Sequence, residues 1–338
     1  MLPRGGHAPW NAHCARRRCW ASRRAKRYEP RRRLHGDSRR RPRGDDIVSI
    51  STRDYSRQDT LGVGVELIRQ LKRKRTLVAF LLVVALPLIV VAAVRFGPSS
   101  NGDDGGNQGG GFGGGNFDLV GLATNGAWNF TITMLLFSSG FLLVIIAAMF
   151  LGDTVASEAS WSTLRYLLVA PVPRRKLLRT KAVVGLLLTA IVLVTLVLTS
   201  WAIGAIAFGT APLASPFGGA LTQTESLQRL TVITTYIAIT LLFPAAIAFL
   251  MSVLTDVPLG AVGTAVVVVT IFNILDAIEA LGSLRRFLPS DYGSTWVDAM
   301  NPVIVWDQMA VGVAYNLIAF ALLVGIAVLR FDRKDITS

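Results

Sequence analysis

The chain has 338 residues, of which 52% are hydrophobic, and its mean hydropathy is +0.49. These values exclude an ordinary soluble domain, because long apolar runs of this kind are typical of membrane-spanning helices. The formal net charge is +14, but 15 of the 35 lysines and arginines lie within the first 43 positions, so much of the positive charge is concentrated in one short segment.

Residues 1–47 form an arginine-rich arm with few aliphatic residues and no hydrophobic periodicity. We expect this arm to be disordered, because it cannot bury enough apolar surface to fold. Three interpretations stay open: upstream DNA translated from a start codon placed too early, a disordered basic tail, or an arm that binds phosphate groups. No specific nucleic-acid partner is predicted. Cys14 and Cys19 are the only cysteines and lack the second ligand pair of a zinc site, so no metal site is predicted.

Residues 48–75 are predicted to contain a cytoplasmic interfacial helix. Its apolar side chains recur at helical spacing within 56–75, at Leu61, Val65, Ile68 and Leu71. The basic run Lys72–Arg75 follows and would lie among anionic headgroups. A helix that is simply solvated is the alternative.

Residues 76–338 are predicted to form an all-α integral membrane domain with six transmembrane helices. A bilayer core of about 30 Å needs about 20 apolar residues at helical rise. Six runs satisfy this requirement: Leu77–Val94, Trp128–Leu151, Ala182–Phe208, Thr231–Leu254, Leu259–Leu281 and Met309–Leu329. The first loop, 97–127, is glycine-rich and is expected to be a flexible external linker.

The distribution of cations predicts the orientation of these spans. Segments 48–75 and 152–181 carry seven and six cations, and the tail after the last span carries three more. The loops on the other side carry few cations, among them Arg229, Arg285 and Arg286. Because cytoplasmic loops are enriched in lysine and arginine, both termini and loop 152–181 are expected to be cytoplasmic. The chain is therefore predicted to be a multi-pass protein of the cell membrane, either plasma or inner.

The loop at 152–181 is the most informative segment. It begins with acids at Asp153 and Glu158, continues through an amphipathic stretch, and breaks at Pro171-Val172-Pro173. A basic segment then leads into the third span. We expect a short helix over about 154–168 that faces a cytoplasmic partner.

Motifs of hydrolytic or phosphoryl-transfer chemistry are missing from the sequence. It contains no Gly-x-x-x-x-Gly-Lys-Ser/Thr loop, no His-Glu-x-x-His and no Gly-x-Ser-x-Gly motif, and no histidine follows position 35. We therefore do not expect an enzyme. Any energy for transport would come from a partner or an ion.

Loop 152–181 resembles the cytoplasmic loop of type 2 ABC exporter permeases, which are membrane subunits paired with a separate ATP-binding cassette protein. The positions that carry the resemblance are Asp153, Glu158, Ser162-Thr163-Leu164, Pro171-Val172-Pro173-Arg174 and Lys181. Ser162 and Pro173 depart from the family pattern, which usually has glycine and serine or threonine there. The six-span layout extends the resemblance over roughly 48–338.

The resemblance implies a coupling helix between spans two and three that docks into a groove of the ATPase. The residues assigned to this docking are Asp153, Glu158, Trp161, Ser162, Thr163, Leu164, Arg165, Pro171, Arg174 and Lys181. ATP would be bound by the partner, so no cofactor is expected on this chain. The permease would act as a homodimer or pseudo-dimer and form the translocation path of an exporter.

Two other functions remain as alternatives. An ion-coupled secondary transporter would need carboxylates buried near the middle of the membrane. Asp276 and Glu279 are the only acidic pair near the apolar runs, and they lie close to the end of the fifth run. A membrane scaffold or assembly factor without transport activity is the second alternative. The transported substrate is not predicted.

Overall fold

The part of the chain that the structure describes is built from helices and connecting turns, without strands. The computed structural model describes residues 62–96, 119–160, 174–214, 221–301, 304 and 306–333. The chain divides into two units, Met1–Asp54 and Tyr55–Ser338, and all described residues belong to the second. The arm predicted at 1–47 therefore lies outside the described residues.

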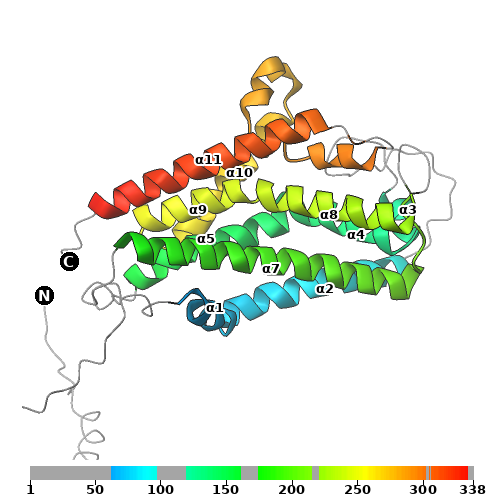
Figure 1. Cartoon of the computed structure of the whole chain (residues 1–338), viewed down its shortest axis with the longest axis horizontal. Coiled ribbons are helices and arrows are strands. Elements are labelled where there is room, and N and C mark those ends of the chain that lie inside the picture. Colours follow the sequence, from blue (N-terminus) through cyan, green and yellow to red (C-terminus); the bar gives the residue numbers. More distant parts are fainter. Residues whose placement is uncertain are drawn as a thin grey trace, which may run out of the picture. The chain divides into compact units, whose positions relative to one another are not determined.

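Six helical spans in the described part are long and apolar enough to cross a membrane, and they lie side by side along a common direction (Figure 1). They indicate a multi-pass membrane protein and confirm the predicted number of spans. Their bounds are Lys74–Phe96, Ala127–Ser157, Arg175–Phe208, Gln223–Leu254, Pro258–Asp276 and Trp306–Arg333.

A short helix precedes the first span. Helix α1 (Val63–Leu71) ends at a turn, and α2 (Lys74–Phe96) begins three residues later. The predicted interfacial segment 48–75 was therefore too long at its end, because residues 74 and 75 belong to the first span. In α1, the apolar side chains of Val65 and Ile68 are exposed, while Glu66 and Gln70 are buried against the rest of the fold. Contact of this apolar face with lipid stays a prediction.

The second span contains a π-helical turn. Helix α4 (Ala127–Phe137) leads into η1 (Ser138–Leu142) and then α5 (Leu143–Ser160). A π turn holds one more residue than an α turn and often marks a functional region. Helix α3 (Leu119–Thr124) precedes this span, so part of the segment 97–127, which was predicted to be a flexible linker, is helical. Residues 97–118 lie outside the described part.

The third span is continuous and the fourth is broken. Helix α7 (Arg174–Phe208) forms the third, and α8 (Gln223–Thr240) and α9 (Leu242–Leu254) together form the fourth. Thr222 and Glu225 start α8 with a reciprocal capping box. Pro244 has no N–H to offer the carbonyl of Thr240, which accounts for the break at Leu241.

The fifth span is shorter than predicted. Helix α10 (Pro258–Asp276) ends five residues before the predicted boundary at Leu281. The chain then forms two 3₁₀ segments, η2 (Glu279–Phe287) and η3 (Thr295–Met300). Gly282 inside η2 has φ 50°, a left-handed conformation that interrupts the helix. Helix α11 (Trp306–Arg333) is the sixth span.

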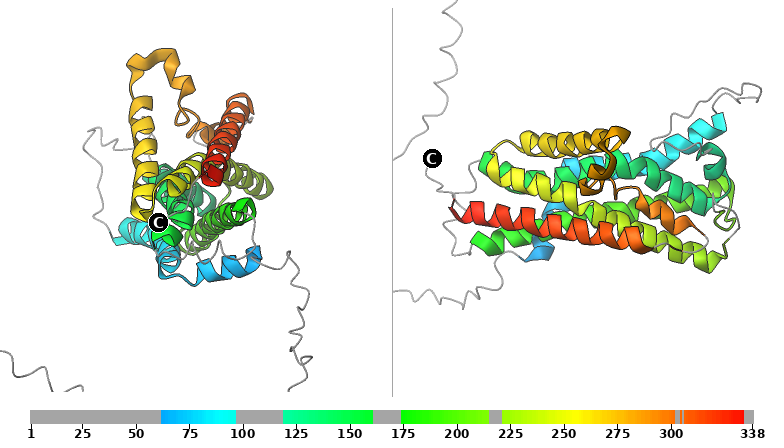
Figure 2. Two further views of the ribbon diagram at one scale, coloured as in Figure 1. Left: turned by 90° about the vertical axis from the view of Figure 1, so that its left-hand side faces the viewer. Right: turned by 90° about the horizontal axis from the view of Figure 1, so that it is seen from above.

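The spans alternate in direction, so the described residues define two ends, which can be followed in Figure 2. We call the end with α1, the start of α7 and the end of α11 the basic end, and the opposite end the far end. Twelve described lysines and arginines lie at the basic end: Arg69, Lys72, Arg73, Lys74, Arg75, Arg174, Arg175, Lys176, Arg179, Lys181, Arg330 and Arg333. The far end has four, namely Arg95, Arg229, Arg285 and Arg286.

The core lies around the second, third and fourth spans, which are more buried than the other three. Helix α5 packs on α7, α9 and α10, whereas α4 packs mainly on α7. The second span is therefore the central element of the described unit. A polar group on α5 is enclosed by several neighbouring helices.

Candidate functional site

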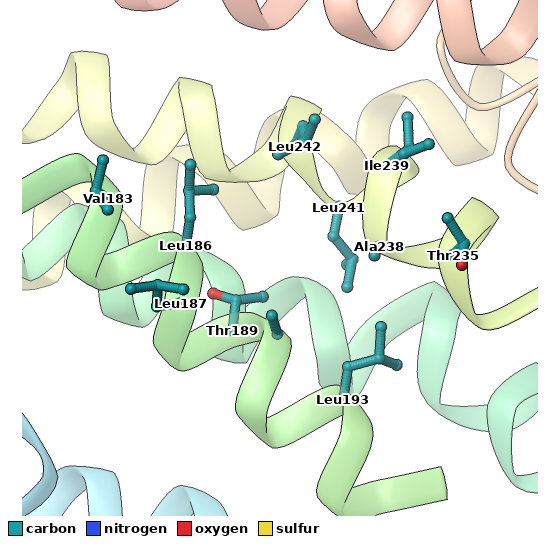
Figure 3. A pocket seen from close by; sticks show the side chains of 11 residues that line it. Val183, Leu186, Leu187, Thr189, Leu193, Thr235, Ala238, Ile239, Leu241 and Leu242 are labelled. Atoms are coloured by element: carbon teal, nitrogen blue, oxygen red, sulfur yellow. The ribbon is translucent and has the colours of Figure 1, made fainter. Parts of the chain in front are cut away.

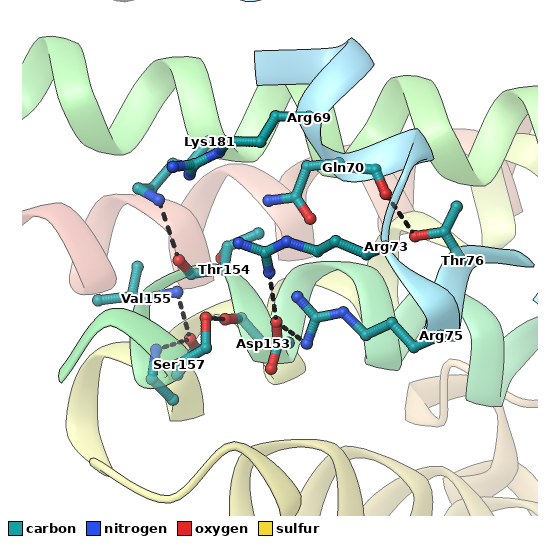
Figure 4. A network of polar contacts seen from close by, with 12 residues as sticks. Arg69, Gln70, Arg73, Arg75, Thr76, Asp153, Thr154, Val155, Ser157 and Lys181 are labelled. Atoms are coloured by element: carbon teal, nitrogen blue, oxygen red, sulfur yellow. Dashed lines mark hydrogen bonds and ion pairs between the residues drawn. The ribbon is translucent and has the colours of Figure 1, made fainter. Parts of the chain in front are cut away.

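Asp153 lies near the end of α5, inside the fold, and pairs with Arg73 in the turn before the first span and with Arg75 in its first turn. Its Oδ2 accepts a hydrogen bond from Arg73 Nη1 at 3.3 Å and forms an ion pair with Arg75 (Figure 4). The side chain of Asp153 is 9% exposed, and those of the two arginines are about one third exposed. This pairing offsets the cost of placing a carboxylate inside the protein.

Lys181 joins the third span to the same region. Its Nζ donates a hydrogen bond to the backbone oxygen of Thr154 at 3.2 Å, and the residue is only 2% exposed. Thr154 itself is buried and donates its hydroxyl to the carbonyl of Leu151 at 2.7 Å. The end of α5 is thus connected to α7 by a buried ammonium group.

Ser252 of α9 closes the opposite side of α5. Its Oγ accepts hydrogen bonds from the backbone N–H groups of Val155 and Ala156, both at 3.0 Å. Nearby, Gly152 lets α5 approach α10 closely, because a Cβ there would lie 3.0 Å from Val262 Cγ2. The last turns of α5 are therefore held by hydrogen bonds from Ser252 of α9 and Lys181 of α7 and by close packing on α10.

Helix α1 packs on α7 and α2, and polar side chains on its buried face bond to one another. Gln70 Nε2 and Arg69 Nη2 both donate to Glu66 Oε1, at 3.0 and 2.8 Å. Thr76 Oγ1 donates to the carbonyl of Gln70 at 2.7 Å, which fixes the turn between α1 and α2. We define the basic-end cluster as Glu66, Arg69, Gln70, Arg73, Arg75, Thr76, Asp153, Thr154, Lys181 and Ser252.

The residues predicted to dock an ATPase fall into three groups. Asp153 and Lys181 are buried and bonded within the chain, so their side chains do not form an external docking surface as predicted. Glu158 and Arg174 lie at the end of α5 and the start of α7, and their side chains are not described. The remaining residues lie outside the described part: Trp161, Ser162, Thr163, Leu164, Arg165 and Pro171.

The helix boundaries also change the predicted loop. Residues 152–160 belong to α5 and residues 174–181 belong to α7, so the linking segment is 161–173 rather than 152–181. The helix predicted over 154–168 consequently does not begin at Thr154, because α5 continues without interruption to Ser160. Residues 161–168 of that predicted helix lie outside the described part.

Sequence reasoning missed Arg73, Arg75 and Ser252 as members of the cluster. A signal for the arginines was present: the start of the first span and the end of the second must lie on the same side of a membrane. An acidic side chain at the end of the second span can therefore pair with basic side chains at the start of the first span. Ser252 carried no such signal, since a single serine in an apolar run indicates nothing specific about its partners.

A cavity of about 390 Å³ lies between α7 and the break in the fourth span (Figure 3). Its lining is almost wholly apolar and includes Leu186, Leu193 and Leu241. The two hydroxyls in the lining belong to Thr189 and Thr235, and each bonds to a carbonyl of its own helix. The cavity therefore favours hydrocarbon groups over polar ligands.

Within the described residues, histidine, cysteine and acidic side chains do not gather in a group that could hold a metal ion. The basic-end cluster contains buried charges but offers no nucleophile paired with a base. Its contacts connect residues of α1, α2, α5, α7 and α9 at the basic end.

The relationship of the chain to known proteins is established at the family level. A search of curated proteins gave no match. A family described as "Protein of unknown function (DUF2705)" matches residues 116–337, about two thirds of the chain. This match includes α5, α7 and α9 of the basic-end cluster but begins after α1 and α2. The chain is therefore a member of the DUF2705 family.

Proposed function

We propose that this protein is the membrane-spanning permease subunit of an ATP-driven exporter, with both termini and the basic end on the cytoplasmic side. The observation that carries the proposal is the way in which the spans on either side of segment 161–173 are bound together. Lys181 at the start of α7 bonds to Thr154 near the end of α5, and Asp153 pairs with arginines at the beginning of the first span. The sequence resemblance of this loop to ABC exporter permeases supports the same function.

The contacts suggest how movement would pass through the protein. A partner that displaced segment 161–173 would act on the end of α5 and the start of α7. Helix α5 packs on α9 and α10, and α7 packs on α2 and α1. The buried ion pairs and hydrogen bonds of the basic-end cluster would make these helices move together, because separating them leaves buried charges without partners.

The apolar cavity supports a lipophilic or amphiphilic cargo within this proposal. It lies beside the break at Leu241, where Pro244 leaves one backbone hydrogen bond of the fourth span unmade. Both hydroxyls already donate to backbone carbonyls and can only accept further hydrogen bonds, so a strongly polar cargo would lose more hydrogen bonds with water than it could regain there.

Purification from the native membrane tests the proposal. The affinity-tagged full chain is extracted in mild detergent with its associated proteins, which are identified by mass spectrometry. We expect an ATP-binding cassette protein in about equimolar amount. If no such protein is recovered under conditions that preserve other membrane complexes, the proposed function is wrong.

A charge-reversal variant tests the docking segment separately. Glu158→Arg combined with Arg165→Glu is expected to reduce the recovered ATPase at least about tenfold, because like charges across an interface are strongly unfavourable. Arg286→Glu combined with Asp291→Arg is the matched control at the far end and should leave recovery unchanged. Equal recovery with both variants would show that the docking residues are assigned wrongly, even though the complex exists.

A further inference from the structure

We propose that the basic end carries a binding site for the phosphate of an anionic phospholipid, formed by Arg330 and Arg333 of α11 and by Val253 and Leu254 of α9. These four residues line a cavity of about 260 Å³, which we call the arginine pocket. The site is independent of the proposed transport function and of the ATPase.

The position of the arginine pocket matches the depth of lipid headgroups. Leu254 is the last residue of α9, and Arg333 is the last residue of α11. Both helices are long and apolar enough to cross a membrane, so their ends at the basic end lie where the hydrocarbon core gives way to headgroups. The pocket is thus open at the level of phospholipid phosphates rather than in free solvent.

The two arginines provide positive charge that is not neutralised within the described residues. They lie three positions apart on α11, on the same face of the helix, and both are exposed. Asp332 lies between them in sequence, but its carboxylate accepts from Arg175 Nε at 2.8 Å. No ion pair joins Arg330 or Arg333 to a carboxylate of the described part. Guanidinium groups in this arrangement bind phosphate oxygens through charge-assisted hydrogen bonds.

The rest of the arginine pocket is lined by apolar side chains, which favour a phospholipid over a free phosphate ion. Val253 is buried, while Leu254 is 46% exposed beside the guanidinium groups. A free phosphate ion would gain nothing from these side chains. A phospholipid presents its phosphate and glycerol together with the first methylenes of its acyl chains, and it would satisfy both parts of the pocket.

Native mass spectrometry of the full chain in detergent micelles tests the proposal. The probes are phosphatidylglycerol and phosphatidylcholine with identical acyl chains, titrated separately, and the dissociation constant of the first bound lipid is measured. We expect phosphatidylglycerol to bind at least about tenfold more tightly than phosphatidylcholine. Arg330→Ala combined with Arg333→Ala should abolish most of this preference.

A matched control separates a specific site from a generally basic surface. Lys72→Ala combined with Lys74→Ala removes the same amount of charge from exposed positions at the same end. It should change the dissociation constant by no more than about twofold. An equal loss of affinity in both double variants would overturn the proposal, because it would show only nonspecific attraction. Unchanged binding in the double arginine variant would overturn it as well.

Two further measurements identify the ligand and guard against misfolding. Inorganic phosphate at millimolar concentration should not displace phosphatidylglycerol, and displacement would mean that the pocket binds free phosphate instead. Leu254→Glu changes one exposed residue and places a carboxylate beside the arginines. It should weaken phosphatidylglycerol binding about tenfold, and unchanged binding in this variant would also refute the assignment.

Discussion

The buried Nζ of Lys181 lies 3.2 Å from the carbonyl oxygen of Thr154, 27 positions earlier in the chain. The two residues stand on either side of segment 161–173, at the end of one span and the start of the next. A lysine is rarely so buried unless it has partners, and here it holds two neighbouring spans together where the linking segment leaves them.

Replacing Lys181 tests this connection. Lys181→Met keeps most of the side-chain volume but leaves the Thr154 carbonyl without this donor, so we expect a loss of about 1–3 kcal/mol in stability. Thermal unfolding in detergent, followed by tryptophan fluorescence, measures the effect. Arg179→Met changes an exposed cation on the same helix and should leave the midpoint nearly unchanged. Equal midpoints for both variants would contradict the proposed connection.

Asp153 is expected to be more sensitive than an exposed acid. In Asp153→Asn the arginines at 73 and 75 lose their carboxylate partner, and we expect a destabilisation of about 2–4 kcal/mol, since breaking a largely buried pair is costly. Asp332→Asn, which disrupts an exposed pair with Arg175, should cost less than about 1 kcal/mol. Thermal unfolding midpoints of the two variants measure the difference. A smaller decrease for Asp153→Asn than for Asp332→Asn would be evidence against the structural role of Asp153.

Gly152 tests the close packing of α5 against α10. A methyl group at this position would lie 3.0 Å from Val262 Cγ2 and 3.3 Å from the Val262 backbone nitrogen. Gly152→Ala should therefore destabilise the protein by about 1–3 kcal/mol. Gly263→Ala is the control, because its Cβ would meet nothing within 4 Å. If the two alanine variants unfold at the same temperature, the helices are not packed as closely as described.

Asn129 fixes the connection between the third and fourth spans at the far end. Its side chain donates to the Ala214 carbonyl at 3.1 Å and accepts from the Ala214 N–H at 3.0 Å. Asn129→Ala leaves both backbone groups without this partner and should cost about 1–3 kcal/mol. Asn273→Ala alters an exposed asparagine and should have little effect. Unfolding midpoints of the two variants check this prediction.

Cysteine labelling tests the orientation of the spans. In a background of Cys14→Ser and Cys19→Ser, a cysteine is introduced at Lys72 or at Arg286. A membrane-impermeant maleimide should label the variant at 286 in intact cells and the variant at 72 only after permeabilisation. The reverse pattern would place the basic end outside the cell, and labelling of both in intact cells would contradict an arrangement in which the two residues lie on opposite sides.

The sequence predicted the spans well because hydrophobic length is a strong and local signal. Each expected run overlaps one of the six helical spans, and only the fifth run extends beyond its span, where η2 replaces the last predicted turns. The break at Leu241 was harder to predict, since a proline in a membrane helix does not always interrupt it. The π-helical turn at Ser138–Leu142 has no sequence signal that we can identify.

The candidate site was predicted only in part, because it depends on contacts between distant segments. Asp153 and Lys181 were selected from the loop pattern, but burial gives them an internal role rather than the external one expected. Their partners lie far away in sequence; Arg73 and Asp153 are 80 positions apart. Such pairing follows from how the helices pack, and a pattern within one loop does not contain this information.

The π-helical turn determines how a change in the length of the second span would affect the direction in which α5 faces. Because a π turn holds one more residue than an α turn, deleting one residue from 138–142 can convert it to a regular α turn while α4 and α5 keep their facing. Deleting one residue from the regular helix at 143–151 has no such relief, since successive residues of an α-helix are rotated by about 100°. Asp153 and Gly152 would then face the wrong neighbours. The two deletions shorten the span equally and leave its hydropathy nearly the same, yet only the second one removes its charged contacts.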